Sequence, residues 1–333
     1  MWFIFLSILI SIITSILVIK FSNKYNIFID SDKTNKPQGF HDKATPRSGG
    51  IAIISSLFIF LILPFGIKIL IPSIFAFISG ILEDFRNSLS AKSRLILQII
   101  AAFIAIWLTG AVIQYLGLNI YLPYWVGVFF TIFAIVGLMN AINIIDGFNG
   151  LASGISLLIF ISFAINSYYV DNIELLEINL VIIGSILGFF IFNFPKGKIF
   201  LGDGGAYLIG FLIAIVGVFL SNKYSNVSPW YVLAVSIYPV WEVIFSIIRK
   251  LSLGQSPFKP DRYHFHMLVY RVITKNNPLT SLFVNLFIMP FIFYSTFNAH
   301  NSIANIVTIT IFIEVYTLIY FYLYSKDKRE GNI

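Results

Sequence analysis

Long apolar runs separated by short polar segments cover the chain from its first residues to about residue 324. A membrane helix needs about 20 apolar residues to cross about 30 Å of hydrocarbon, and eleven runs approach that length. The pattern therefore predicts an all-α polytopic membrane protein, one integral-membrane domain over 1–333 with a short tail at 325–333. The expected spans are approximately 2–20, 48–65, 67–82, 95–110, 124–144, 151–169, 178–194, 205–220, 229–248, 279–299 and 302–324.

The composition agrees with a membrane protein. Hydrophobic residues make up 58% of the chain and charged residues only 11%, against about a quarter charged in soluble domains. The first run has no basic start and no small-residue cleavage site, which favours a retained helix over a signal peptide. Cysteine is absent, so disulfides, thiolate ligands and cysteine nucleophiles are excluded.

Basic residues predict the orientation, because Lys and Arg collect in cytoplasmic loops. Eleven spans with the N-terminus outside place 20 of the 22 Lys and Arg residues on the inner side and leave only Lys68 and Lys223 outside. The segment 171–177, expected outside, is acidic. We therefore expect a cytoplasmic C-terminus. The net charge of +7 is an orientation signal, and no nucleic-acid partner is needed to explain it.

The same topology places five polar segments, 30–50, 83–94, 140–150, 193–205 and 249–277, on the cytoplasmic side. In the third, Asn140, Asn143 and Asp146 recur at three-residue spacing, which makes them neighbours on a helix surface. Gly147 and Gly150 then let the backbone turn. Together the five segments predict an active site at the cytoplasmic face of the membrane.

Two further segments carry carboxylates. Glu83 and Asp84 are adjacent, and two carboxylates at a membrane edge are costly unless a cation or a proton resolves their repulsion. Mg²⁺ suits such oxygen donors, although a solvated loop with a helix cap explains the pair equally well. Asp203 lies among glycines before an apolar helix, whose first N–H groups we expect to meet a phosphate while Asp203 holds a metal ion. A lone Gly-Asp-Gly is also a common turn.

The last segment contains two histidines, His264 and His266, beside Arg262. Without cysteine or a His-x-x-x-His pattern a zinc site is unsupported, and cationic or proton-donor roles toward phosphates fit better. Glu242 and Glu314 fall inside expected spans, where charge is expensive. Structural pairing or protonation explains these two at least as well as catalysis, so we leave them outside the catalytic set.

At this point a resemblance becomes specific. Four runs of the chain resemble the polyprenyl-phosphate N-acetylhexosamine-1-phosphate transferases. They are Asn-Ala-Ile-Asn-Ile-Ile-Asp-Gly-Phe-Asn-Gly from Asn140, Phe-Leu-Gly-Asp-Gly-Gly from Phe200, Asp-Arg-Tyr-His-Phe-His from Asp261, and His41 followed by Pro-Arg-Ser-Gly-Gly. Within that superfamily the chain is more similar to the bacterial undecaprenyl-phosphate GlcNAc-1-phosphate transferase branch (glycosyltransferase family 4) than to the muropeptide-transferring branch.

The resemblance implies transfer of an N-acetylhexosamine 1-phosphate from a UDP-sugar to undecaprenyl (polyprenyl) phosphate in the bacterial inner membrane. UMP leaves, Mg²⁺ is the expected cofactor with Mn²⁺ as the alternative, and the reaction initiates a cell-envelope glycan. The roles it implies are metal binding by Asp203 and Glu83, catalysis by Asp84 (the proton acceptor), Asp146, His264, His266 and Arg262, and substrate binding by His41, Asn140, Asn143, Asn193 and Phe200.

Two positions depart from the family pattern. Glu83 stands where relatives usually carry aspartate, and Asn149 stands where they often carry a second aspartate. Asn149 keeps an oxygen ligand but cannot act as a base, so the base must be sought at Asp84 or Asp146. A covalent aspartyl-phosphate is the competing route. The alternatives left open are muropeptide-1-phosphate transfer, an inactive scaffold, and a transporter or flippase, although a transporter usually places ionisable groups near the bilayer midplane. The sequence does not fix the sugar, the downstream glycan or the oligomeric state, including a homodimer.

Overall fold

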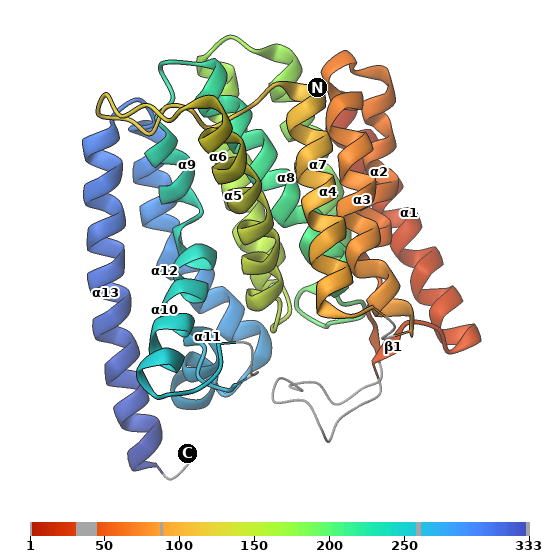
Figure 1. The fold of residues 1–333 in the computed structure, drawn as a ribbon. Helices are drawn as coiled ribbons and strands as arrows, with labels where there is room; N and C mark the ends of the chain where they lie inside the picture. The colour runs from red at the N-terminus through yellow and green to blue at the C-terminus, as the bar shows by residue number, and fades with distance from the viewer. Residues whose placement is uncertain (1, 31–44, 87–88, 258–260, 331–333) are drawn as a thin grey trace.

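The computed structural model describes residues 2–30, 45–86, 89–257 and 261–330 (Figure 1). These residues are almost entirely helical, which confirms the all-α expectation. Two very short strands, not expected from the sequence, pair antiparallel with Ile29 opposite Pro46. In chain order the elements are α1 (Trp2–Tyr25), β1 (Ile29–Asp30), β2 (Thr45–Pro46), α2 (Gly49–Leu57), η1 (Phe58–Ile62), α3 (Pro64–Arg86), α4 (Ala91–Thr109), α5 (Tyr124–Ile145), α6 (Leu151–Tyr169), α7 (Ile173–Asn193), α8 (Gly202–Lys223), α9 (Pro229–Val235), α10 (Ile237–Ser252), α11 (Phe265–Val269), η2 (Tyr270–Thr274), α12 (Asn277–Phe297) and α13 (Ser302–Arg329).

Nine helices in the described part of the chain are long and apolar enough to cross a membrane, so eleven full spans was too high. The expected span 48–65 is not among these nine helices: it contains the 9 residues of α2 and the 5 residues of η1. At 1.5–2.0 Å per residue these reach about 21–24 Å, short of the roughly 30 Å needed.

The expected span 229–248 is a broken helix. Its two halves, α9 and α10, meet at an angle of 76° and count as a tenth span only if taken together. Pro239 lies in the first turn of α10. A proline there removes a backbone donor and its ring clashes with the carbonyl four residues earlier, which is Val235, the last residue of α9. The sequence therefore carried a signal for this bend.

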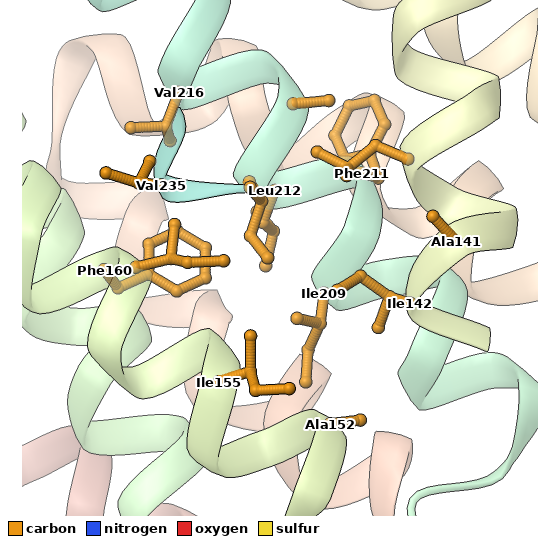
Figure 2. Close-up of a cluster of buried hydrophobic side chains, with 14 of the residues drawn as sticks. Ala141, Ile142, Ala152, Ile155, Phe160, Ile209, Phe211, Leu212, Val216 and Val235 are labelled. Carbon is orange, nitrogen blue, oxygen red and sulfur yellow. The ribbon is translucent and has the colours of Figure 1, made fainter. Parts of the chain in front are cut away.

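Helix α8 forms the centre of the fold (Figure 1). It packs against α3, α5, α2 and α6, and 94% of its apolar 18-residue stretch is buried inside the protein. Figure 2 shows Ile209, Phe211 and Leu212 of α8 facing apolar side chains of α5, α6 and α9. A helix that is apolar all round belongs in such a position.

Helix α1 packs through small residues instead. Its buried positions are Ser7, Ser11, Ser15 and Ser22, and a side chain at Gly188 of α7 would collide with Ser11. The Ser11 hydroxyl donates to the carbonyl of Ser185 at 2.7 Å. Close approach of small residues is a common way for membrane helices to associate.

The polar segments gather at one end of the bundle, the lower end in Figure 1, where β1, α10 and α11 lie. The C-terminal end of α13 reaches the same end, whereas the N-terminus lies at the opposite end. The fold thus brings together segments that the sequence places far apart.

Candidate active site

Asp203, in the first turn of α8, is the meeting point of three other segments. Its Oδ1 atom accepts hydrogen bonds from Arg47 Nη2 at 3.3 Å and Asn143 Nδ2 at 3.1 Å. Its Oδ2 atom accepts from Arg94 Nη1 at 3.0 Å. Both arginine side chains keep about a quarter of their surface exposed, at 27% and 25%. One carboxylate therefore holds two arginines that solvent can reach.

Asp84 caps the beginning of α8. Its Oδ1 accepts from the backbone N–H of Asp203 at 3.0 Å and its Oδ2 from that of Gly204 at 2.9 Å. Its side chain is only 1% exposed, and Arg47 Nη2 lies 3.9 Å away. We expected these N–H groups to meet a phosphate, and the structure corrects this: they are already bonded to a carboxylate from α3.

Glycines allow α2, α3 and α8 to come this close. A Cβ on Gly80 of α3 would run into the backbone of Asp203, and a Cβ on Gly50 of α2 would run into the backbone of Gly205. The backbone of the same region is tied by Gly50 N–H donating to the carbonyl of Leu201 at 3.0 Å. These direct backbone contacts fix the positions of Asp84 and Asp203 relative to each other.

Asp146 immediately follows α5 and behaves differently from the other two acids. Its carboxylate makes no hydrogen bond or ion pair with another described residue. Burial raises the pKa of Asp146 to about 7; the charge of Arg47 opposes this rise, while Asp203 and Asp84 add to it. We call Asp84, Asp146, Asp203, Arg47 and Arg94 the carboxylate cluster. Asp146 is its one carboxylate that is still open to a ligand.

Two expected site residues lie near the carboxylate cluster but make other contacts. Glu83 accepts from the backbone N–H of Leu89 at 3.2 Å, so it stabilises its own loop. Asn140 Nδ2 donates to Gln98 Oε1 at 2.8 Å, linking α5 to α4. In the described part of the chain neither side chain is hydrogen-bonded to Asp203, whereas Asn143, one turn after Asn140, is.

The residues expected on the segment 193–200 mainly hold loops together. Asn193 accepts from the N–H of Gly150 at 2.7 Å and donates to the carbonyl of Ile199 at 2.9 Å. The backbone N–H of Phe200 donates to the carbonyl of Pro46 at 2.8 Å. Substrate binding by these two residues stays a prediction. His41 lies outside the described residues.

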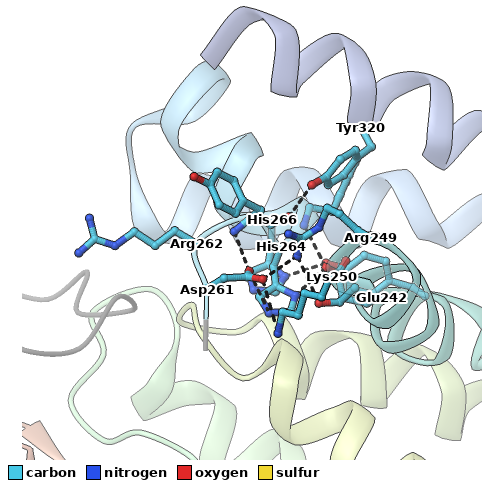
Figure 3. A network of polar contacts seen from close by, with 12 residues as sticks. Glu242, Arg249, Lys250, Asp261, Arg262, His264, His266 and Tyr320 are labelled. Carbon is cyan, nitrogen blue, oxygen red and sulfur yellow. Dashed lines mark hydrogen bonds and ion pairs between the residues drawn. The ribbon is translucent and has the colours of Figure 1, made fainter. Parts of the chain in front are cut away.

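A second polar group surrounds the two histidines (Figure 3). His264 Nδ1 lies 2.9 Å from Glu242 Oε1, and Tyr316 donates to Glu242 Oε2 at 2.9 Å. His266 Nδ1 lies 3.1 Å from the hydroxyl of Tyr238. We call these five residues the histidine network. Glu242 is thus paired inside the protein, as expected, whereas Glu314 is exposed on α13.

Asp261 joins this network at its edge. It accepts from Arg249 Nη2 at 2.8 Å, and Lys250 Nζ and His264 Nε2 lie 3.5 Å and 3.9 Å from its carboxylate. Burial would raise the pKa of Asp261, but hydrogen bonds from Arg249 and the Tyr263 N–H hold it below its usual value. Arg262 is exposed and points away from the histidines (Figure 3), so its catalytic role stays a prediction.

The loop between α5 and α6 connects the two polar regions. Asp146 belongs to the carboxylate cluster, while a Cβ on the next residue, Gly147, would lie 3.7 Å from His266 Nε2. The ring of Phe148 contacts His266 edge-on at a centroid distance of 5.8 Å. The motif around Asp146 therefore sits between the carboxylates and the histidines.

Comparison with known proteins identifies the family. The family described as Glycosyl transferase family 4 matches residues 66–221. "Probable undecaprenyl-phosphate N-acetylglucosaminyl 1-phosphate transferase" of Bacillus subtilis (strain 168) is 31% identical over 273 residues, which cover 78% of this chain and 75% of the relative. The chain belongs to glycosyl transferase family 4. The matched region contains Asp84, Arg94, Asp146 and Asp203, which are four of the five residues of the carboxylate cluster.

Two further relatives have similar identity to this chain and carry two different names. "Undecaprenyl-phosphate alpha-N-acetylglucosaminyl 1-phosphate transferase" of Thermotoga maritima is 31% identical over 74% of this chain and 75% of its own. "Phospho-N-acetylmuramoyl-pentapeptide-transferase" of Lactobacillus gasseri is 32% identical over 69% of this chain and 79% of its own. This family 4 protein is a multi-pass membrane protein with bacterial homologues.

The donor atoms of the carboxylate cluster fit the Mg²⁺ that the resemblance implies. Among the described residues no group of three His, Cys, Asp or Glu side chains could hold a metal ion alone. Mg²⁺ in phosphate-transferring sites is usually bound by one or two carboxylates together with substrate phosphates. Asp203 supplies hard oxygen donors of this kind.

Three residues of the site were missed by the sequence reasoning. Arg94 was read only as an inner-side charge, and Arg47 as such a charge within the Pro-Arg-Ser-Gly-Gly run. Nothing in the sequence shows that Arg47 meets an aspartate 156 positions away. Glu242 did carry a signal, since a carboxylate inside an apolar run is costly without a partner. Its partner, a histidine 22 residues later, becomes visible only with the fold.

Proposed function

We propose that this protein transfers an N-acetylhexosamine 1-phosphate from UDP-N-acetylhexosamine to undecaprenyl (polyprenyl) phosphate, the initiating step of a cell-envelope glycan. An oxygen of the lipid phosphate bonds to the sugar-bearing phosphorus, the bond from that phosphorus to the bridging oxygen breaks, and UMP leaves. The observation that carries the proposal is the carboxylate cluster, four of whose five residues lie in the family 4 region and in which two partly exposed arginines share one aspartate.

The reaction brings two anions together, so charge neutralisation and alignment dominate catalysis. Arg47 and Arg94 are partly exposed, at 27% and 25%, so solvent and substrate phosphates can reach their guanidinium groups. Mg²⁺ or Mn²⁺, held by Asp203 together with those phosphates, would add positive charge where the transition state develops negative charge.

A proton on the lipid phosphate needs an acceptor, and the geometry favours Asp146 over Asp84. Both oxygens of Asp84 already accept backbone hydrogen bonds, and its side chain is 1% exposed. Burial raises the pKa of both acids to about 7, which suits a general base, so the contacts decide: among the described residues Asp146 has no such partner. We therefore replace Asp84 by Asp146 in this role.

We place the protein in the bacterial inner membrane, with the site and the tail on the cytoplasmic side. The basic residues collect around the polar segments at the end of the bundle where the C-terminus lies. UDP-sugars are made in the cytoplasm, so this orientation gives the donor direct access. A fusion reporter active only outside the cytoplasm should stay silent at the C-terminus, and strong activity there would contradict the orientation.

The second candidate is muropeptide-1-phosphate transfer, favoured by the Lactobacillus gasseri relative at 32% identity. The deciding experiment supplies purified protein with undecaprenyl phosphate, Mg²⁺ and either UDP-GlcNAc or UDP-MurNAc-pentapeptide, and measures UMP. We expect UMP from UDP-GlcNAc and none when the lipid or the metal is left out. UMP from the muropeptide donor alone would establish the second candidate, and no UMP from any donor would leave a scaffold or a flippase.

A further inference from the structure

Helix α10 contacts both histidines of the network from one face. Tyr238 and Glu242 are four residues apart, so their side chains lie one above the other on the helix surface. The Tyr238 hydroxyl contacts Nδ1 of His266, and the Glu242 carboxylate contacts Nδ1 of His264. The two imidazole planes are parallel within 3°, with centroids 5.5 Å apart (Figure 3). Each ring is thus held at its Nδ1 atom by an oxygen of a side chain from α10.

Glu242 fixes the protonation of the His264 ring. Its side chain is only 2% exposed, and it accepts from the Phe265 N–H at 3.0 Å and the Tyr316 hydroxyl at 2.9 Å. An ionised carboxylate only accepts hydrogen bonds. Nδ1 of His264 must therefore carry a proton, and Nε2 is the nitrogen left for a substrate.

His266 is held in the complementary way. It is fully buried, and its Nε2 has no hydrogen-bond partner among the described residues. Burial lowers the pKa of His266 to about 3, with Glu242 opposing the shift and His264 adding to it, so the ring is neutral at pH 7. If Tyr238 donates to Nδ1, the proton of the neutral ring is on Nε2. That N–H lies beside Gly147 and needs an acceptor.

We propose that Glu242 and Tyr238 are positioning residues that anchor Nδ1 of His264 and His266, so that the Nε2 atom of each ring faces the anionic substrate. His266 offers an N–H there, whereas His264, whose Nε2 lies 3.9 Å from Asp261 Oδ1, donates to an anion only when both of its nitrogens carry protons. The proposal rests on the proposed function for the identity of that substrate. It also gives α13 a part in the site, because Tyr316 holds the second oxygen of Glu242. Neither Glu242 nor Tyr238 touches the reacting atoms in this scheme, so each acts through its histidine.

The protonation states can be measured without any substrate. We would label the histidines with ¹⁵N in the full-length protein, record their ring nitrogens by NMR, and assign the signals with His264→Gln and His266→Gln. We expect a protonated Nδ1 in His264 and a protonated Nε2 in neutral His266. In Glu242→Gln the amide can donate to Nδ1, so His264 should lose its Nδ1 proton. An unprotonated Nδ1 of His264 in the wild-type protein would overturn the proposal.

Kinetics separate positioning from a merely structural role. Glu242→Gln should lower kcat by about 100-fold or more, as loss of a carboxylate that orients a catalytic histidine does elsewhere, with KM changed less than about threefold. When Glu242→Gln is combined with His264→Gln, kcat should fall no further than in His264→Gln alone. Glu314→Gln is the matched control, because it makes the same change on an exposed acid and should leave kcat within about twofold.

If the fold-loss of kcat in the Glu242→Gln, His264→Gln double variant equals the product of the two single fold-losses, the residues act independently and the proposal is overturned. If Glu242→Gln does not fold, Tyr238→Phe in wild-type and His266→Gln backgrounds gives the same test while keeping the ring in place. Should the wild-type protein release no UMP but show the expected ring protonation, the proposed function fails and the anchoring by α10 stands. The two ideas can therefore fail separately.

Discussion

The carboxylate cluster and the histidine network satisfy their polar groups in different ways. In the cluster, charges from α3, α4, α8 and the segment before α2 balance one another, its arginines are about a quarter exposed, and Asp146 has no hydrogen-bond or ion-pair partner among the residues that the structure describes. In the histidine network, the rings are buried and one helix holds both of them. The first arrangement has partners to exchange, whereas the second is fixed before a substrate arrives.

This difference suggests a division of labour. A site that must receive two anionic substrates needs positive groups that the substrates can reach, and the partly exposed Arg47 and Arg94 meet that need. Groups that stabilise a developing charge work best when they need no reorganisation, and the anchored histidines meet that requirement. Mutations in the two regions should therefore differ in kind.

The largest effect is expected from Asp203→Asn, which removes the charge that holds both arginines and the proposed metal. We expect kcat to fall by about 100- to 1,000-fold, with part of the loss recovered by added Mg²⁺. A Mg²⁺ titration of UMP release measures both effects. Asp171→Asn, a change at an exposed acid, serves as the control. A defect that no Mg²⁺ concentration relieves would separate Asp203 from metal binding.

Asp146→Asn is expected to lower kcat by about 100-fold, as loss of a general base does. The base acts when deprotonated and its pKa is about 7, so the wild-type rate should rise as pH increases through about 7 and level off above it. The variant should lack this rise. A pH–rate profile from 5.5 to 8.5 checks the prediction, and an unchanged profile in Asp146→Asn would rule out the assignment.

Asp84→Asn should act on the fold more than on the chemistry. The amide can accept only one of the two backbone hydrogen bonds at the start of α8, so we expect the free energy of unfolding to fall by about 1–3 kcal/mol. A lower melting temperature at every pH is the expected result. If instead the melting temperature is unchanged and the activity defect shrinks at high pH, Asp84 is the proton acceptor after all.

The smallest effect is expected from Asn149→Asp. Asn149 Nδ2 donates to the carbonyl of Pro195 at 3.1 Å at an exposed position, and a carboxylate would lose this bond. The cost should be about 0.5–1.5 kcal/mol, with kcat reduced less than about threefold because the side chain contacts neither polar region. Thermal unfolding and UMP release measure the two quantities. A tenfold loss of kcat at unchanged stability would place Asn149 in the site.

Hydropathy was sufficient to find the helices but not their form. It located the nine long helices because their apolar composition is visible in any window of the sequence. It overcounted at 48–65 because a short buried helix has the same composition as a span. At 229–248 the bend depends on Pro239, and a hydropathy window averages over that single residue.

The sequence also named acids, amides and histidines of the site but not their partners. Asn143, Asp146, Asp203, His264 and His266 stand in polar segments between apolar runs and could be found by that contrast alone. The contacts of Asp203 with Arg47 and Arg94, at separations of 156 and 109 residues, depend on which helices are neighbours. Helix packing is set by three-dimensional complementarity, so these pairs and the capping role of Asp84 could not be read from one sequence.

The glycine contacts between α2, α3 and α8 limit how this protein can evolve. Gly50 and Gly80 touch backbone atoms of Gly205 and Asp203 with no room for a methyl group. Almost any replacement at these glycines would therefore push α2 or α3 away from the start of α8. Selection for a new donor sugar cannot reshape this junction gradually. Diversification of substrate preference should instead accumulate in the polar loops around it, while the junction itself remains the slowest-changing part of the chain.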